Sequence, residues 1–112
     1  MSEVPEIDVA TLAALQAHGV PLIDVREVHE YAAARVPSAQ LIPMGEVAGR
    51  IGEVPREGTV YVICASGGRS ARVVAHLRAN GVDAVNVAGG TVGWMNAGLP
   101  IEADTEPEAG IG

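Results

Sequence analysis

The stretch from Val60 to Leu77, VYVICASGGRSARVVAHL, decides the fold. It opens with a continuous run of apolar β-forming residues, 60–63, which is typical of a strand buried on both faces. From Ser70 onward, apolar residues recur at the spacing of one helix face, at Val73, Val74 and Leu77. The sole cysteine, Cys64, therefore falls at the carboxyl end of a buried strand, directly before a loop and a helix.

The loop between this strand and this helix is suited to holding an anion. It consists of Ala65, Ser66, Gly67, Gly68 and Arg69. Its two glycines can adopt backbone angles closed to other residues, so the loop can curl around the sulfur. Successive N–H groups of the loop and of the first helical turn can then point at one atom. Partial charge from the helix and full charge from Arg69 would lower the pKa of Cys64 below the value of about 8.5 of a free thiol.

We therefore expect Cys64 to be a nucleophile at neutral pH. The alternative is that Cys64 is a small buried apolar residue and that the glycines only form a tight turn. The coincidence of Cys, Gly-Gly, Arg and a helix start within 64–70 favours the nucleophile.

This loop resembles the active-site loop of rhodanese-like sulfurtransferases, in which four residues separate a cysteine from an arginine; here Ser70 follows the arginine. Three other segments resemble the same family in the family's order: LIDVRE at 22–27, RVPSA at 35–39 with Ile42 and Pro43, and VAGG at 87–90 with Trp94 and AGLP at 97–100. Four motifs in order are far more specific than any one of them. The chain departs from the pattern at Ala34, Arg35 and Ser38, where the family commonly has glycine, histidine and glycine; these positions shape a turn and do not supply the nucleophile.

The resemblance implies an α/β fold, the rhodanese-like sandwich, with a central, mainly parallel five-stranded sheet and helices on both faces. The pattern of the chain agrees, because strands alternate with helices, which indicates right-handed crossovers in a parallel sheet. We expect strands near Ile7 and at 22–25, 39–42, 60–63 and 84–87. We expect helices from the N-cap Asp8 to Gly19, around 30–33, at 47–51, from Ser70 to the C-cap Gly81, and at 91–97. Ligands of such sheets bind beyond the carboxyl ends of the strands, where Cys64, Arg26 and the Gly89-Gly90 turn would meet.

The activity that the resemblance implies is that of a thiosulfate sulfurtransferase. Cys64 would take a sulfane sulfur from a donor such as thiosulfate, hold it as a persulfide, and pass it to a thiol or cyanide acceptor. This cycle needs no cofactor and no metal. An open alternative is a persulfide carrier or binding module that serves a partner protein and has little activity on small molecules. A phosphatase or arsenate reductase is disfavoured, because phosphatases with a similar cradle have one residue more between cysteine and arginine.

Roles follow for the individual residues of this loop and its neighbours. Cys64 is the expected nucleophile, and the backbone N–H groups of the segment that follows form its cradle: Ala65, Ser66, Gly67, Gly68, Arg69 and Ser70. Arg69 either faces an anionic substrate or anchors the loop by pairing with Glu27 or Glu30. Arg26 is expected to be a second anion contact. Asp24 is expected to order the site by hydrogen bonding, because a carboxylate near an anionic substrate would repel it.

The length and net charge of the chain limit the number of domains and the class of partner. The 112 residues suffice for one domain, placed at 1–101, and we expect an acidic, disordered tail at 102–112. The net charge is −7, but four of the acids lie in this tail, which leaves ten acids and seven arginines, or −3, for the domain. No basic stripe is present to neutralise phosphates, so no nucleic acid is expected as a partner.

The expected location is the cytoplasm. A lone cysteine cannot form an intramolecular disulfide and fits a reducing compartment. The amino terminus is acidic without an apolar run, which is not the pattern of a signal peptide, and no apolar stretch approaches the ~20 residues that span a membrane. The three histidines are not spaced as metal ligands.

Overall fold

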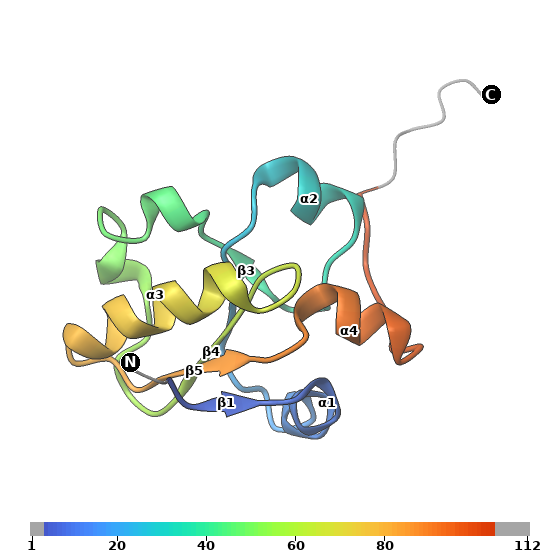
Figure 1. Ribbon diagram of the computed structural model, residues 1–112, viewed down its shortest axis with the longest axis horizontal. Coiled ribbons are helices and arrows are strands. Elements are labelled where there is room, and N and C mark those ends of the chain that lie inside the picture. Colours follow the sequence, from blue (N-terminus) through green and yellow to red (C-terminus); the bar gives the residue numbers. More distant parts are fainter. Residues whose placement is uncertain (1–3, 105–112) are drawn as a thin grey trace.

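A five-stranded sheet runs through the middle of the molecule, and all of its strand pairs are parallel. The computed structural model describes residues 4–104 (Figure 1). The strands are β1 Glu6–Ile7, β2 Leu22–Asp24, β3 Gln40–Leu41, β4 Val60–Ile63 and β5 Ala84–Val87. Their order across the sheet is β1-β5-β4-β2-β3, so the strand that leads to Cys64 is the central one.

Helices cover both faces of this sheet, as expected. They are α1 Val9–Gln16, α2 Val28–Ala33, α3 Gly68–Ala79 and α4 Gly90–Asn96. Side chains of β4 alternate between two apolar cores, because successive residues of a strand point to opposite faces. Val60 and Val62 pack in the core that includes Val73, Val74 and Leu77 of α3. Ile63 packs in the other core, with Leu12 of α1 and Trp94 of α4. Burial on both faces explains the continuous apolar run of β4.

The expected helix at 47–51 is wrong. The chain forms two short 3-10 turns there instead, η1 Met44–Glu46 and η2 Ile51–Glu53. Gly45, Gly49 and Gly52 interrupt this segment, and glycine disfavours a helix interior. Other boundaries agree within a few residues, and Asp8 caps α1 by accepting the N–H of Thr11 at 2.9 Å. Helix α3 ends at Ala79 with Asn80 as its C-cap, so Gly81 (φ 85°), the expected C-cap, lies one position beyond the observed one.

Residues 102–104, which the sequence assigns to the tail, contact the domain. Glu102 forms an antiparallel bridge with Arg35, in which their backbone N–H and C=O groups pair at 2.8 and 2.9 Å. The guanidinium of Arg35 pairs with the carboxylate of Asp104 at 2.9 Å. Composition alone assigned these acids to a tail, because composition does not reveal that Arg35 pairs with them. The remainder of the expected tail, 105–112, lies outside the described residues.

The described part of the chain contains no helix that is both long enough and apolar enough to cross a membrane.

The first turn of α4 packs directly on Cys64 and the loop that follows it. The N–H groups of Thr91 and Val92 donate to the carbonyl oxygens of Cys64 and Ala65 at 2.8 and 2.9 Å. Gly90 lies at this contact with φ 60°, and a Cβ atom there would come within 2.5 Å of both carbonyl oxygens. Only glycine allows this approach, because the obstacle is backbone and cannot rotate away.

We predict that Gly90→Ala lowers the free energy of unfolding by roughly 3 kcal/mol, the sum of a left-handed backbone and a steric conflict. Gly98→Ala is the matched control, because Gly98 has φ 75° but open space around its Cα. It should lose only about 1 kcal/mol. Urea unfolding of both variants measures the difference, and equal losses would show that the contact with the loop is not what requires glycine at position 90.

Candidate active site

Cys64 lies at the carboxyl end of the central strand and is only 1% exposed. The loop after it returns to the sulfur: Gly67 donates its N–H to Sγ at 3.1 Å, and the hydroxyl of Ser70 lies 3.3 Å from Sγ. Gly67 has φ 111°, a conformation that favours glycine, and it is the N-cap of α3. The loop therefore has the tight curl around the sulfur that the two glycines predict.

At Cys64, hydrogen bonds lower the pKa of the thiol by more than burial raises it. Burial alone raises the pKa of the thiol, because it disfavours the charged form. The Ser70 hydroxyl and the backbone N–H groups of Ser70, Gly67 and Ser66 act in the opposite direction, and the pKa of Cys64 is lowered overall. Of the other residues expected in the cradle, Ala65, Gly68 and Arg69 make no hydrogen bond to the sulfur within residues 4–104; they connect those that do.

Arg69 forms a two-pronged ion pair with Glu30 of α2, at 2.9 and 3.0 Å. The pair lowers the pKa of Glu30 to about 2, chiefly through the hydrogen bond from Arg69. Glu27, the other carboxylate considered for this pairing, instead begins α2 in a capping box with Glu30. This geometry favours the anchoring role of Arg69 over direct contact with a substrate. It ties α2 to the loop around the sulfur.

Asp24 and Arg26 form a second, buried pair at the end of β2. The guanidinium of Arg26 bonds to the Asp24 carboxylate at 2.7 to 3.1 Å and to the Ala34 carbonyl at 2.8 Å. Asp24 is 0% exposed and Arg26 5%. Asp24 thus lies where it can order the strand end, whereas the guanidinium of Arg26 bonds to protein groups. The expected anion contact through Arg26 is not supported by this arrangement. The sequence signal for this pair was the i, i+2 spacing of Asp24 and Arg26 at the end of a strand, because residues two apart in an extended chain point to the same side.

Two polar residues that the motifs did not single out, Asn86 and Glu6, extend the hydrogen bonds around the sulfur. Asn86 of β5 is 1% exposed and accepts the hydroxyl of Ser70 through its Oδ1. Its amide NH2 donates to the Glu6 carboxylate at 3.0 Å and to the Gly67 carbonyl at 3.2 Å. An asparagine inside the apolar strand AVNV was the sequence signal, since buried polar groups need partners.

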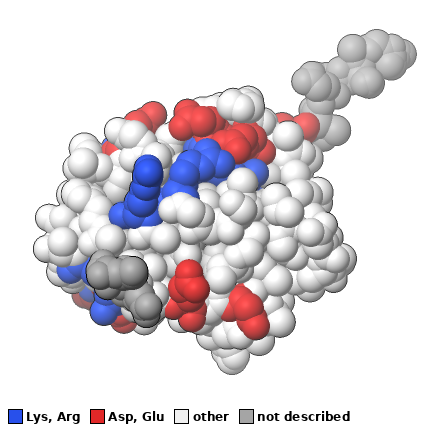
Figure 2. Space-filling view, viewed as in Figure 1, with Lys and Arg blue, Asp and Glu red and all other residues white. Residues whose placement is uncertain are grey.

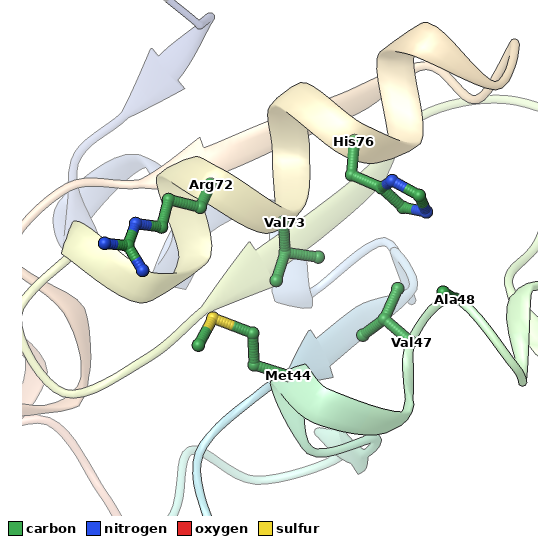
Figure 3. A pocket seen from close by; sticks show the side chains of 6 residues that line it. All are labelled: Met44, Val47, Ala48, Arg72, Val73 and His76. Atoms are coloured by element: carbon green, nitrogen blue, oxygen red, sulfur yellow. The ribbon is translucent and has the colours of Figure 1, made fainter.

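A third residue that sequence reasoning missed, Arg72, borders a hollow along α3. The hollow has a volume of about 180 Å³ and is lined by Met44, Val47, Ala48, Arg72, Val73 and His76. Figure 3 shows Met44, Val47 and Val73 facing one another, with Arg72 and His76 along the helix. The sequence signal for Arg72 was its position three residues after Arg69, which places both arginines on one side of a helix. Within residues 4–104, Arg72 has no ion-pair partner. Figure 2 shows arginines between α2 and α3 with acidic side chains beside them.

The chemistry available at this site is that of an anionic sulfur held by N–H and O–H donors. Such donors stabilise negative charge on a nucleophile without reorganising during the reaction. Among the described residues, no group of three His, Cys, Asp or Glu side chains is placed to hold a metal ion.

Comparison with known proteins gives consistent matches. The family model of the rhodanese-like domain matches residues 8–97. A protein of Allochromatium vinosum named "Sulfurtransferase" is 37% identical over 89% of this chain and 96% of its own length. The Bacillus subtilis "Putative sulfur carrier protein YrkF" is 33% identical over 83% of this chain and 52% of its own length.

Solved structures agree with these sequence matches. A rhodanese-related protein of Thermoplasma volcanium superposes with a TM-score of 0.83 and 31% identity, over 88% of this chain and 97% of that one. A thiosulfate sulfurtransferase of Pseudomonas aeruginosa gives a TM-score of 0.78 and 25% identity, over 91% of this chain and 21% of that one. The order of the motifs, the parallel sheet and the family match agree, and this chain belongs to the rhodanese-like domain family of sulfurtransferases.

Proposed function

We propose that this protein transfers a sulfane sulfur from a donor such as thiosulfate to a thiol or cyanide, through a persulfide on Cys64. The observation that carries this proposal is the set of donors around a buried sulfur: the Gly67 N–H at 3.1 Å and the Ser70 hydroxyl at 3.3 Å. These donors suit a sulfur that carries negative charge. The structural neighbour from Pseudomonas aeruginosa, named a thiosulfate sulfurtransferase, supports thiosulfate as the donor to test first.

The first half of the cycle forms one S–S bond and breaks another. The Cys64 thiolate attacks the outer sulfur of thiosulfate, and the S–S bond of thiosulfate breaks with its electron pair leaving on sulfite. The total charge is conserved, since a thiolate and a dianion give a persulfide anion and the sulfite dianion. The terminal sulfur of the persulfide then carries the charge that the loop donors stabilise.

The second half returns the enzyme to its starting state. Cyanide attacks the terminal sulfur of the persulfide and leaves as thiocyanate, and the electron pair of the S–S bond returns to Cys64 as a thiolate. A thiolate acceptor follows the same course and leaves as a persulfide. The two half-reactions share one intermediate, which gives ping-pong kinetics.

A persulfide carrier for a partner protein is the second candidate. The Bacillus subtilis relative named as a sulfur carrier favours it. Both candidates form the same persulfide intermediate, because a carrier needs the same cradle. They differ in the rate at which small acceptors remove its sulfur. A carrier would hold the persulfide against cyanide and small thiols and release it only to its partner.

We predict that Cys64→Ser abolishes thiocyanate formation from thiosulfate and cyanide while leaving the thermal unfolding midpoint nearly unchanged, because a hydroxyl cannot form a persulfide. Mass spectrometry of the wild type after thiosulfate treatment should show one added sulfur atom that cyanide removes. Equal turnover by the serine variant would contradict the assignment. An added sulfur that cyanide removes only slowly would favour the carrier.

The Arg69–Glu30 pair predicts how stability depends on pH. Folding lowers the pKa of Glu30 from 4.5 to about 2, so its carboxylate stabilises the protein above pH 4.5 and loses that contribution as the pH falls toward 2. The free energy of unfolding of the wild type should therefore fall more between pH 5 and about pH 3 than that of Glu30→Gln.

The same variants separate the two roles of Arg69. As an anchor, Arg69→Ala and Glu30→Gln should lower stability by amounts that are not additive in the double variant. As a substrate contact, Arg69→Ala should raise the KM for thiosulfate, whereas Glu30→Gln, which frees the guanidinium, should not. Identical pH dependence in the wild type and Glu30→Gln would show that the pair does not form in solution.

Arg72 is our candidate for attracting the anionic donor, since the guanidinium groups of Arg69 and Arg26 are both paired. We predict that Arg72→Ala raises the KM for thiosulfate about two- to fivefold at low salt, with a smaller effect at high salt. Arg78→Ala is the matched control, because Arg78 lies near the other end of α3 and pairs with Asp83. An equal rise in both variants would indicate an effect of net charge only.

A further inference from the structure

A chain of hydrogen-bonded polar groups runs from the buried nucleophile across the sheet to the exposed Glu6 of β1. It joins Cys64, Ser70, Asn86 and Glu6 through the hydrogen bonds described above. Cys64 and Asn86 are 1% exposed and Ser70 is 0% exposed, so water does not complete their hydrogen bonds. The proposed reaction uses the Ser70 hydroxyl but gives no role to Asn86.

The partners of Asn86 determine which way its side-chain amide faces. The Glu6 carboxylate and the Gly67 carbonyl can only accept hydrogen bonds, and they lie 3.0 and 3.2 Å from the amide nitrogen. The NH2 group must therefore point toward them. The opposite side of the amide, the acceptor Oδ1, faces the hydroxyl of Ser70.

Ser70 has one hydroxyl proton and more acceptors than that proton can serve. Its oxygen lies 3.3 Å from the Cys64 sulfur, 3.3 Å from the Gly67 carbonyl, and closest to Oδ1 of Asn86. The Gly67 carbonyl already accepts the N–H of Ala71 and the amide of Asn86. The competition for the proton is therefore between Asn86 and the sulfur.

The charge on the sulfur decides this competition. When the sulfur is a neutral thiol, its S–H can donate to the Ser70 oxygen while Ser70 donates to Asn86, and every group is satisfied. When the sulfur is an anion, the Ser70 proton turns to it, and Oδ1 of Asn86 is left buried without a donor. A buried acceptor without a donor is unfavourable.

We propose that Asn86 is a positioning residue that competes with the Cys64 sulfur for the Ser70 proton, so that this proton serves the sulfur only when the sulfur is anionic. This competition keeps the thiolate more basic than the loop donors alone would make it. A more basic thiolate is intrinsically more nucleophilic. The inference rests on the proposed role of Cys64 as the nucleophile and concerns a residue on a neighbouring strand.

Other charged groups at this edge of the sheet are the same in every variant compared below. They include Glu6 on β1 and Asp8 after it, Asp24 at the end of β2 and Arg26 after it, Glu27 and Glu30 at α2, and Arg69 and Arg72 on α3. Helix α4 contributes no charged or titratable side chain. Differences between variants at Ser70 and Asn86 therefore report the shared proton and not a change in these charges.

The test is the pH dependence of alkylation by iodoacetamide, which reads Cys64 alone because the chain has one cysteine. In Asn86→Leu the competing acceptor is gone, so the midpoint of the profile should move to lower pH. Strengthening one hydrogen bond of ordinary size should raise the rate on the acid limb about two- to threefold and lower the limiting rate at high pH about twofold. Ser70→Ala should move the midpoint to higher pH.

The double variant distinguishes competition from simple packing damage. In the Ser70→Ala background, Asn86→Leu should have no effect on the midpoint, because no proton remains to be shared. Asn86→Ala, with a smaller side chain, should shift the midpoint in the same direction as Asn86→Leu. A midpoint that moves up or stays unchanged in both single Asn86 variants would overturn the proposal, as would an undiminished shift in the double variant.

This measurement does not depend on sulfur transfer. If the wild type forms no persulfide but the variants shift as stated, the proposed function fails and the competition stands. If the persulfide forms but the Asn86 variants do not shift the midpoint, the competition fails and the proposed function stands.

Discussion

A buried sulfur that carries negative charge must be surrounded by hydrogen-bond donors, because an uncompensated charge away from water is strongly unfavourable. The donors here are backbone N–H groups and one hydroxyl, and the neighbouring elements orient them. The N–H of Val92 holds the carbonyl of Ala65 at 2.9 Å. Since C=O and N–H point in opposite directions in a trans peptide, this bond turns the N–H of Ser66 toward the sulfur, where it lowers the pKa of Cys64. Gly90 is required for this contact, so the start of α4 helps to set the charge state of Cys64, the residue that follows β4.

The arginines around the site act mainly as clamps between elements. Arg69 joins α3 to α2 through Glu30, Arg26 joins the end of β2 to the Ala34 carbonyl, and Arg35 holds Asp104. A bidentate guanidinium suits this task because its geometry matches a carboxylate. The anion-stabilising character of the site therefore comes mostly from oriented dipoles, whose contribution is not screened as strongly by salt as that of exposed charges. Arg72, which borders the hollow along α3, is then the cation that we propose attracts an anionic sulfur donor.

Sequence patterns predicted the sheet, both helical layers and the curl of the loop, because apolar periodicity and glycine placement are local signals. Patterns failed at 47–51, where the glycines interrupt a weak helical signal, and at residues 102–104, where acidic composition hid the pairing with Arg35. Within the site, Cys64 and its loop could be predicted from one segment. The partners of Arg26 and Arg69, and the contact of Asn86 with Ser70, depend on which strands are adjacent and in which register, and no local pattern contains that information.

Register is what connects Asn86 to the nucleophile. Glu6 of β1 lies opposite Asn86, and Asn86 lies opposite Val62, two residues before Cys64. Parallel strands align their carboxyl ends, so residues 80 positions apart in the sequence, Glu6 and Asn86, bind each other, and Asn86 in turn binds Ser70 beside the sulfur. A slip of β5 by one residue would turn Asn86 to the opposite face and place a valine beside Ser70. Ala84 and Val87, which pack in the two apolar cores, prevent that slip. The packing of apolar side chains along β5 thereby determines the hydrogen bonding of the thiol that follows the adjacent strand, β4.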